Sequence, residues 1–454
     1  MATSIRQFNI ELYEEHLEEA SFLYEQRLAY LHDPELTWKD LDEFEERFEA
    51  HIDALVVGGD LAVEVCKRRC SEGDFGELHA ALRVFCRQGR SDLAYAVLQN
   101  GIDVDEDVAN AIINALKAEC PEHWHDDLIR VLLGSASQLI GPVAGTLGYR
   151  RVPVEDALFR MASQADDAGL PFLLKAMGRV GSERSRAAIT PHLKSEDEAV
   201  AAEACRALVR LGDYQALRHG LLVAQAKPWP ILSLGIGGDH TAVNVLTDIV
   251  KSDKVSREAL FALGLLGDLS SVTHIFNCLQ NPEVAMAAAV ALQTITGAEL
   301  YEEVFVPEEI DPDELFDEER EKYEATGEVP TRPDGQPFGE TMHQISINPE
   351  TWRQWLEEHR ASFNVKLKYR HGKPMSPAAS FLALEAEHTP NGIRELILDE
   401  FAARYAQNFP MEFDMPVRRQ QQELAGIREW VKENQSRFAA GHWYFAGKPM
   451  QTGS

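Results

Sequence analysis

The sequence has few cysteines and no apolar run long enough to cross a membrane. Its six cysteines contain no Cys-x-x-Cys motif, which excludes the usual dithiol and zinc-ribbon spacings. We therefore expect free thiols in a reducing compartment. The opening stretch is acidic and lacks a basic flank followed by an apolar core. We expect no signal peptide, a cytoplasmic location and no contact with membranes.

Positive charge is also scarce. The 44 lysines and arginines stand against 74 aspartates and glutamates, giving a formal net charge of -30. The surplus of acids is concentrated in residues 1–60 and 302–329, whereas residues 330–454 are close to neutral. A field of this sign repels phosphate backbones, so we expect no nucleic-acid partner. The surplus either keeps the protein soluble or attracts a basic partner.

What the sequence does contain is a repeated phrase. EALFALGLLGDLSSVTHI at 258–275 and LLKAMGRVGSERSRAAI at 173–189 both place Gly-x-x-Gly after small and apolar residues. The closing glycine recurs about every thirty residues, a period typical of helical solenoids. We expect it to end a helix in the left-handed conformation, and the Ser or Asp that follows to cap a second helix. These glycines are Gly148, Gly181, Gly212, Gly238, Gly267 and Gly297, and the expected caps are Ser182, Asp213, Asp239 and Asp268.

The period and the caps resemble HEAT repeats of the short bacterial kind, clearly over residues 135–297 and with the same form back to residue 76. One hairpin cannot bury its apolar face alone, so neighbours must stack into a continuous core. We expect the second helix of each unit to build a long curved surface. The predicted fold is mainly all-α, with an α-solenoid of HEAT-like helical hairpins over residues 76–301.

Residues 1–75 are predicted to form an acidic helical cap on this solenoid. Apolar side chains at helical spacing lie on both sides of Asp33-Pro34, which predicts two helices within residues 8–57. Thr37 is the expected cap of the second helix. A terminal cap with one polar face is what a solenoid needs, and an acidic docking surface is the alternative.

The C-terminal part holds a second duplication. WLEEHRASFNVKLKYRHGKPM at 355–375 and WVKENQSRFAAGHWYFAGKPM at 430–450 share Trp, Glu, Phe, Tyr and Gly-Lys-Pro-Met. We predict an acidic solvated linker over residues 302–332 and a small module over residues 333–454 that contains both copies. The aromatic residues form either a small core under each turn or a partner-binding patch. The candidate partner-binding residues are Trp352, Trp355, Tyr369, Trp430, Trp443 and Tyr444.

Several segments together resemble a little-characterised bacterial family of HEAT-repeat proteins. They are EEHLEEASFLYEQR, EFEERFEAHIDAL, ALQTITG and the C-terminal tryptophan and Gly-Lys-Pro segments, so the resemblance spans nearly the whole chain. It implies a cytoplasmic protein of proteobacteria whose genes often lie near type VI secretion genes, beside effector and spike components. The family has no catalytic residues to carry over.

No catalytic or metal-binding pattern stands out. The chain has no His-Glu dipeptide, the pair that metal-dependent HEAT-repeat hydroxylases place on their helices. CPEHWHDD at 120–127 lacks the spacing of a structural zinc site, and SLGIGGD at 233–239 follows a helix rather than a strand. Nothing marks the chromophore pocket of a HEAT-like bilin lyase. We expect no metal, no cofactor and no enzymatic activity, with an enzyme such as a lyase as the alternative.

Extended concave surfaces of helical stacks usually bind proteins or peptides. We therefore expect a non-catalytic scaffold, adaptor or chaperone-like factor whose partner is another bacterial protein, such as a secreted effector or spike protein. An immunity protein that neutralises a toxin is the alternative within binding functions.

Overall fold

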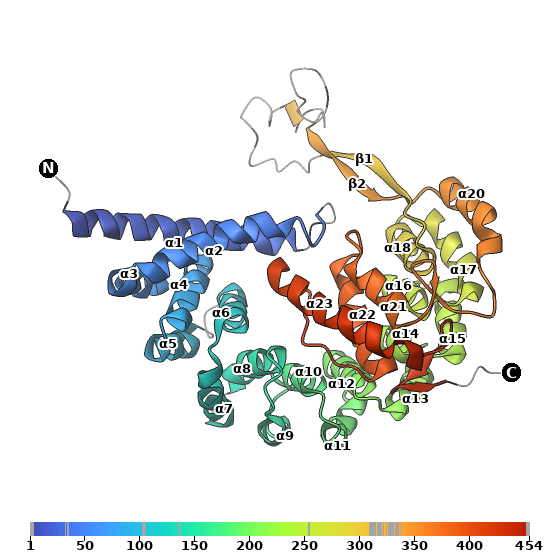
Figure 1. Ribbon diagram of the computed structural model, residues 1–454, viewed down its shortest axis with the longest axis horizontal. Coiled ribbons are helices and arrows are strands. Elements are labelled where there is room, and N and C mark those ends of the chain that lie inside the picture. The colour runs from blue at the N-terminus through green and yellow to red at the C-terminus, as the bar shows by residue number, and fades with distance from the viewer. Residues whose placement is uncertain are drawn as a thin grey trace.

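The computed structural model describes residues 4–31, 33, 36–101, 106–134, 137–252, 255–307, 315, 320, 322, 323, 325, 331, 336 and 338–450. Over these residues the chain is mainly α-helical. Its helices follow one another as hairpins that stack side by side into an arc (Figure 1). The predicted all-α solenoid of HEAT-like hairpins is therefore confirmed.

Three helices begin the arc. They are α1 (Ile5–Tyr30), α2 (Leu41–Val57) and α3 (Gly59–Glu72), and α1 packs against α2 and α4 (Phe75–Arg87). Ser4 caps α1 by accepting a hydrogen bond from the backbone N–H of Gln7. The predicted Thr37 cap is wrong, because α2 begins only at Leu41. The Thr37 N–H instead donates to the Asp40 carboxylate at 2.7 Å and closes the turn before the helix.

The solenoid has two rows of helices. The first helices of the units stack on one another and face the C-terminal part of the chain, whereas the second helices lie on the outside (Figure 1). After α4, the inner row contains α6 (Glu106–Glu119), α8 (Ser137–Tyr149), α10 (Leu170–Val180), α12 (Glu198–Arg210), α14 (Ile231–Gly237), α16 (Arg257–Leu266) and α18 (Ala285–Thr296). The outer row contains α5 (Ser91–Gly101), α7 (His125–Gly134), α9 (Glu155–Ala162), α11 (Ser185–Ile189), α13 (Tyr214–Val223), α15 (His240–Lys251) and α17 (Val272–Asn277).

The first glycine of the Gly-x-x-Gly phrase explains the close spacing of the inner row. A Cβ atom on Gly264 of α16 would lie 3.0 Å from Cα of Ala291 on α18. A Cβ atom on Gly235 of α14 would lie 2.6 Å from Cα of Ala262 on α16. These glycine–alanine contacts draw the first helices together, which bends the stack toward them. The expectation that the second helices build the concave surface was wrong for this reason.

The second glycine takes the predicted left-handed conformation at the end of the inner helices, with two exceptions. Gly148 lies inside α8, and Arg151 takes the left-handed conformation after that helix with φ +55°. Gly238 has an extended backbone with φ -74°, so it ends α14 without a left-handed turn. The remaining predicted glycines are left-handed: Gly181 (φ +81°), Gly212 (φ +75°), Gly267 (φ +66°) and Gly297 (φ +59°).

The aspartates after the glycines cap the next helices as predicted. Asp213, Asp239 and Asp268 each accept a hydrogen bond from the backbone N–H two residues later. Ser182 does not cap, because α11 starts three residues later, at Ser185.

The chain beyond the solenoid begins with a β-ribbon. β1 (Tyr301–Pro307) pairs antiparallel with β2 (Gly339–Ile345), with Tyr301 opposite Ile345. The residues expected to open an acidic linker, from 302 onward, are therefore part of a strand. Backbone pairing with β2 satisfies hydrogen bonds that a solvated linker would leave to water. Most of the remaining predicted linker lies outside the described residues.

The C-terminal helices lie inside the arc (Figure 1), where α22 packs against α12 and α14, and α23 reaches α2. Ser376 caps α21, as its Ser-Pro start predicts. The division into residues 1–75, 76–301, 302–332 and 333–454 stays a prediction about separately folding units. The elements of this module are α20 (Pro349–His359), α21 (Pro377–Glu385), α22 (Asn391–Tyr405) and α23 (Val417–Asn434), with the short strands β3 (Tyr369–Arg370), β4 (Lys373–Pro374), β5 (Tyr444–Phe445) and β6 (Lys448–Pro449).

The duplicated segments form two equivalent hairpins, β3–β4 and β5–β6, each of which caps a helix. Both central residues of each turn have positive φ, as a two-residue type I′ turn requires. Each turn donates two adjacent backbone N–H groups to the last carbonyls of a helix, groups that a helix leaves unpaired. His371 and Gly372 donate to Thr294 (2.8 Å) and Ile295 (3.0 Å) at the end of α18, and Ala446 and Gly447 donate to Ala403 (2.7 Å) and Arg404 (2.9 Å) at the end of α22.

Candidate functional site

The aromatic residues predicted to bind a partner do not form one surface. Trp352, Tyr369, Trp443 and Tyr444 are buried, whereas Trp355 and Trp430 are half-buried. The indole N–H of Trp352 donates to the carbonyl of Ser346 at 2.6 Å, and that of Trp443 to the carbonyl of Leu266 at 2.9 Å.

Each copy of the duplicated segment has its own aromatic cluster. The Phe363 ring lies 6.2 Å from Trp355 and 4.9 Å from Tyr369, and the Phe438 ring lies 6.4 Å from Trp430 and 5.0 Å from Tyr444. This geometry favours a core under each turn. A partner-binding role for these side chains stays a prediction.

Basic side chains recur on the inner helices at a fixed place. They lie six and two residues before a left-handed glycine, on α4, α10 and α12. Side chains four residues apart project from the same face of a helix, so each pair points the same way from the inner row. The pairs are Arg83 and Arg87 before Gly89, Lys175 and Arg179 before Gly181, and Arg206 and Arg210 before Gly212.

On α12 the C-terminal module supplies the opposite charges. Arg206 Nη2 lies 2.9 Å from Glu395 Oε1, and both Arg206 and Arg210 form ion pairs with Asp399. Glu395 and Asp399 are four residues apart on α22, so an acidic pair meets a basic pair. Burial alone would raise the pKa of Asp399, but Arg206 and Arg210 outweigh it and bring that pKa to about 2.

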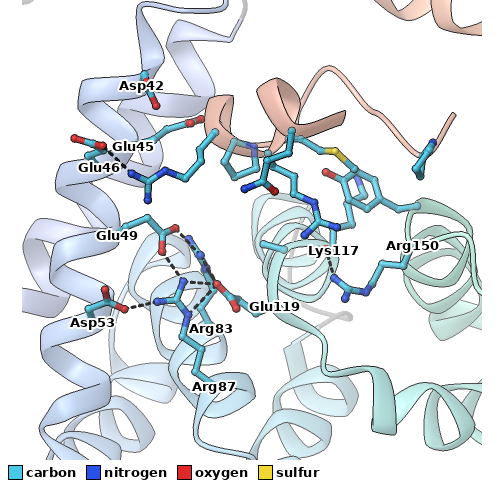
Figure 2. Close-up of a pocket in the computed structure, with 18 of the residues that line it drawn as sticks. Asp42, Glu45, Glu46, Glu49, Asp53, Arg83, Arg87, Lys117, Glu119 and Arg150 are labelled. Atoms are coloured by element: carbon cyan, nitrogen blue, oxygen red, sulfur yellow. Dashed lines mark hydrogen bonds and ion pairs between the residues drawn. The ribbon is translucent and has the colours of Figure 1, made fainter. Parts of the chain in front are cut away.

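The basic pair on α4 forms ion pairs with carboxylates of the N-terminal helices. Arg83 Nη2 lies 2.6 Å from Glu49 Oε1, and Arg87 Nη1 lies 2.7 Å from Asp53 Oδ1. Glu49 and Asp53 are also four residues apart, on α2. Glu119 of α6 pairs with both arginines (Figure 2). Burial would raise the pKa of Glu119, but the two guanidinium groups lower it below its ordinary value.

A cleft of about 650 Å³ opens beside this cluster, between α2, α4, α6, the segment that follows α22 and the start of α23 (Figure 2). Carboxylates of α2 line one side, and Lys117 and Arg150 lie across from them. Lys117 Nζ lies 3.4 Å from the Asp414 carboxylate. We call this site the charged cleft, and its charged residues are Asp42, Glu45, Glu46, Glu49, Asp53, Arg83, Arg87, Lys117, Glu119, Glu122, Arg150, Arg418 and Arg419.

Arg150 differs from its neighbours in the charged cleft. Its Nη1 donates to the Lys117 carbonyl at 3.1 Å, but no carboxylate among the described residues forms an ion pair with it. Within the same described ranges, Arg150 Nε and His125 Nε2 are buried without a hydrogen-bond partner. Burial, together with the charge of Arg150, lowers the pKa of His125. The charged cleft therefore offers a cation that forms no ion pair within the described part of the chain.

Sequence reasoning missed the charged cleft. It assigned the acids of α2 to an acidic helical cap, with an acidic docking surface as the alternative, and did not notice the spacing of the basic pairs. The recurrence of Lys or Arg six and two residues before the repeat glycine was the available signal.

The described residues contain no cluster of three His, Cys, Asp or Glu side chains that could hold a metal ion. In the CPEHWHDD segment at 120–127, Cys120 is buried and the His123 ring meets the Trp124 ring edge to face, 6.0 Å away. All six cysteines are free thiols. No helix in the described ranges has the length and apolar character needed to span a bilayer.

No family model and no curated protein matches the chain. Among solved structures, the complex of CpcE and CpcF of phycocyanin lyase from Nostoc sp. PCC7120 is similar over 51% of this chain and 86% of its own, with 19% identity and a TM-score of 0.29. An engineered protein is similar over 63% of this chain and 86% of its own, with 16% identity and a TM-score of 0.29. At these scores neither likeness carries an argument about function.

Proposed function

We propose that the chain is a non-catalytic protein-binding scaffold, an adaptor or chaperone-like factor, that holds its partner at the charged cleft. This proposal rests on one observation: the basic pairs of the inner row differ in what covers them. The C-terminal module covers the pairs on α10 and α12, whereas the pair on α4 faces an open cleft.

The ion pairs between α12 and α22 indicate how the charged cleft would recognise a partner. Arg206 and Arg210 hold a helix by two carboxylates four residues apart. We infer that a partner segment presents a carboxylate to Arg150 in a similar way. A basic side chain of the same segment would meet the carboxylates of α2, such as Asp42. Complementary charges of both signs give an interface its register and selectivity.

The partner that we propose is a type VI secretion effector or spike component. The support for this choice is the resemblance of the N-terminal helices, the repeats and the C-terminal segments to a family encoded near such genes. The lack of enzymatic activity and the cytoplasmic location stay predictions.

Charge reversal in the charged cleft tests the binding surface. The full-length chain would be purified from its native cell as wild type, Arg150→Glu and Arg418→Glu, and the partner identified by mass spectrometry. The Arg418–Glu46 pair is solvent-exposed, so its loss should cost at most about 1 kcal/mol of stability. We expect the purified partner to bind Arg150→Glu at least about tenfold more weakly than wild type by calorimetry, because the reversed charge repels the partner's carboxylate. Arg418→Glu should bind more tightly, because it frees Glu46 and adds a carboxylate beside those that meet the partner's basic side chain.

Arg160→Glu is the matched control, because Arg160 is exposed on α9 outside the charged cleft. It should bind the partner as wild type does. Wild-type affinity in both cleft variants, with unchanged melting temperatures, would refute the charged cleft as the binding surface.

Gene deletion separates the biological roles. An adaptor predicts that deletion abolishes secretion of the partner and leaves growth intact. If deletion instead kills the cell, and removal of a neighbouring toxin gene restores growth, the protein is an immunity factor and the adaptor proposal fails.

A further inference from the structure

A second cavity, of about 560 Å³, lies where the two ends of the arc meet the C-terminal module. Trp38 comes from the segment before α2, Val290 from α18, His343 from β2 and His388 from the turn between α21 and α22. We call this cavity the seam pocket. None of its described lining residues also lines the charged cleft.

The wall of the seam pocket is mainly apolar. Val290, Ile393 and Ile397 are among the aliphatic side chains that line it. Met286 also lines it and is 41% exposed, so the pocket is open to solvent. Small-molecule sites in proteins typically have volumes of roughly 300–1,000 Å³, apolar walls and a few polar groups. The seam pocket has these properties.

The polar groups of the pocket wall include a hydrogen-bond donor, the indole N–H of Trp38, that has no acceptor among the described residues. Trp38 is only 4% exposed, and its Nε1 is buried with no acceptor among the described residues. Buried N–H groups without a partner are rare in folded proteins. Farther along the wall, the rings of Tyr301, His343 and His388 lie 4.8 to 5.5 Å from one another.

Arg394 places a positive charge behind Trp38. Its guanidinium carbon lies 4.3 Å from the centre of the Trp38 ring, and the side chain is fully buried. It donates to the Leu384 carbonyl and the Asn391 amide oxygen, but no described carboxylate forms an ion pair with it. Burial lowers the pKa of Arg394 to about 9, as expected for a charge without a counter-ion.

Carboxylates also line the seam pocket. Glu387, which lines the pocket, pairs with Lys39 at 3.1 Å. Asp33, which also lines it, has an interaction of its own. Glu387 is therefore already paired with a cation other than Arg394.

We propose that the seam pocket binds a small amphipathic anion, a molecule with an apolar tail or ring and one carboxylate. The apolar part lies against Val290 and Ile397. The carboxylate accepts the Trp38 N–H and lies in the field of Arg394. This proposal is independent of the charged cleft and of the proposed function.

Three ligands with the same apolar chain and different head groups test the proposal on the full-length protein. Calorimetry would compare decanoate, decanol and decyltrimethylammonium. We expect decanoate to bind one to one and roughly tenfold or more tightly than decanol, because a hydrogen bond to a charged group is worth more than one to a neutral group. We expect no binding of the cation. No binding of decanoate below its micellar range, or equal affinity for all three, would overturn the proposal.

Two variants locate the ligand. Trp38→Phe keeps an aromatic ring but removes the N–H, so it should weaken decanoate binding by about tenfold and leave decanol binding unchanged. Met286→Trp places a larger side chain in the wall of the pocket and should abolish binding of both. Leu222→Trp is the control, because Leu222 is exposed on α13 outside the pocket. Decanoate binding that survives Met286→Trp would place the ligand elsewhere and refute the proposal even if Trp38→Phe fails to fold.

Discussion

Tyr369 and Gly267 meet backbone to backbone. The Tyr369 N–H donates to the Gly267 carbonyl oxygen at 2.9 Å, and a Cβ atom on Gly267 would lie only 2.0 Å from the Tyr369 carbonyl oxygen. At Gly297 a Cβ atom would lie 2.7 Å from the backbone of His371. These repeat glycines therefore do more than end a helix, because they also leave the space in which the duplicated hairpin sits.

The first prediction measures that second role. Gly267→Ala should destabilise the protein by more than the roughly 1–2 kcal/mol that a left-handed backbone costs a residue with a side chain. Gly89→Ala is the matched control, since Gly89 has φ +68° and no atom near its missing Cβ. Urea unfolding would compare the two free energies of unfolding. Equal losses would show that the hairpin contact contributes nothing.

The second prediction concerns the ion pairs of Asp399 with Arg206 and Arg210. Asp399→Asn should cost about 3–5 kcal/mol at pH 7, because it leaves two partly buried guanidinium groups without that carboxylate. The folded pKa of about 2 lies below the ordinary value of about 3.9, so this stability is complete above the ordinary value. It is lost as pH falls toward 2.

Chemical denaturation at pH 7, 5 and 3 would test the dependence, with the loss caused by Asp399→Asn smallest at pH 3. Asp156→Asn is the control, since Asp156 pairs with Arg184 on the surface and should cost less than about 1 kcal/mol. A loss from Asp399→Asn that is the same at all three pH values would contradict the assignment.

The third prediction separates the two duplicated tryptophans. Trp430 packs against the rings of Phe401, Phe409 and Phe438, whereas Trp355 stacks on the half-buried His359 at 4.2 Å. Trp430→Ala should therefore approach the ~3–5 kcal/mol typical of a lost core aromatic, and Trp355→Ala should cost less. Thermal unfolding of both variants measures this order, and a pull-down of the native partner checks the alternative. Unchanged melting with lost binding in both would locate the partner surface here.

The fourth prediction concerns Ala406, which ends α22 in the left-handed conformation with φ +54°. The side chain is exposed, so Ala406→Gly removes backbone strain without loss of packing. We expect a gain of about 1 kcal/mol in the free energy of unfolding. Ala440→Gly, at an exposed position where φ is not positive, should instead lose roughly 0.4–1 kcal/mol through added freedom of the unfolded chain. A loss of stability in Ala406→Gly would contradict the strain argument.

The sequence by itself determined the helical hairpins of this protein, their period and most of their caps. Those features depend on residues within one helical turn of each other, such as Gly267 and Asp268. The conformational preferences of such neighbours can be predicted from the sequence because they depend on residue type alone. The same locality explains the errors. Gly238 obeys the period but stays extended, with its carbonyl 3.2 Å from the buried guanidinium of Arg404, far along the chain.

Only the tertiary structure decided which row of helices is concave, where the C-terminal module sits and which basic pair stays beside an open cleft. Each of these depends on contacts between residues that are far apart in the sequence, such as the ion pairs of Arg210 with Asp399 and of Arg83 with Glu49. The duplicated Gly-Lys-Pro segments showed that a turn occurs twice, but not that each turn donates to the end of a helix. The acceptors are backbone carbonyls, which every residue carries, so no side-chain pattern can mark them.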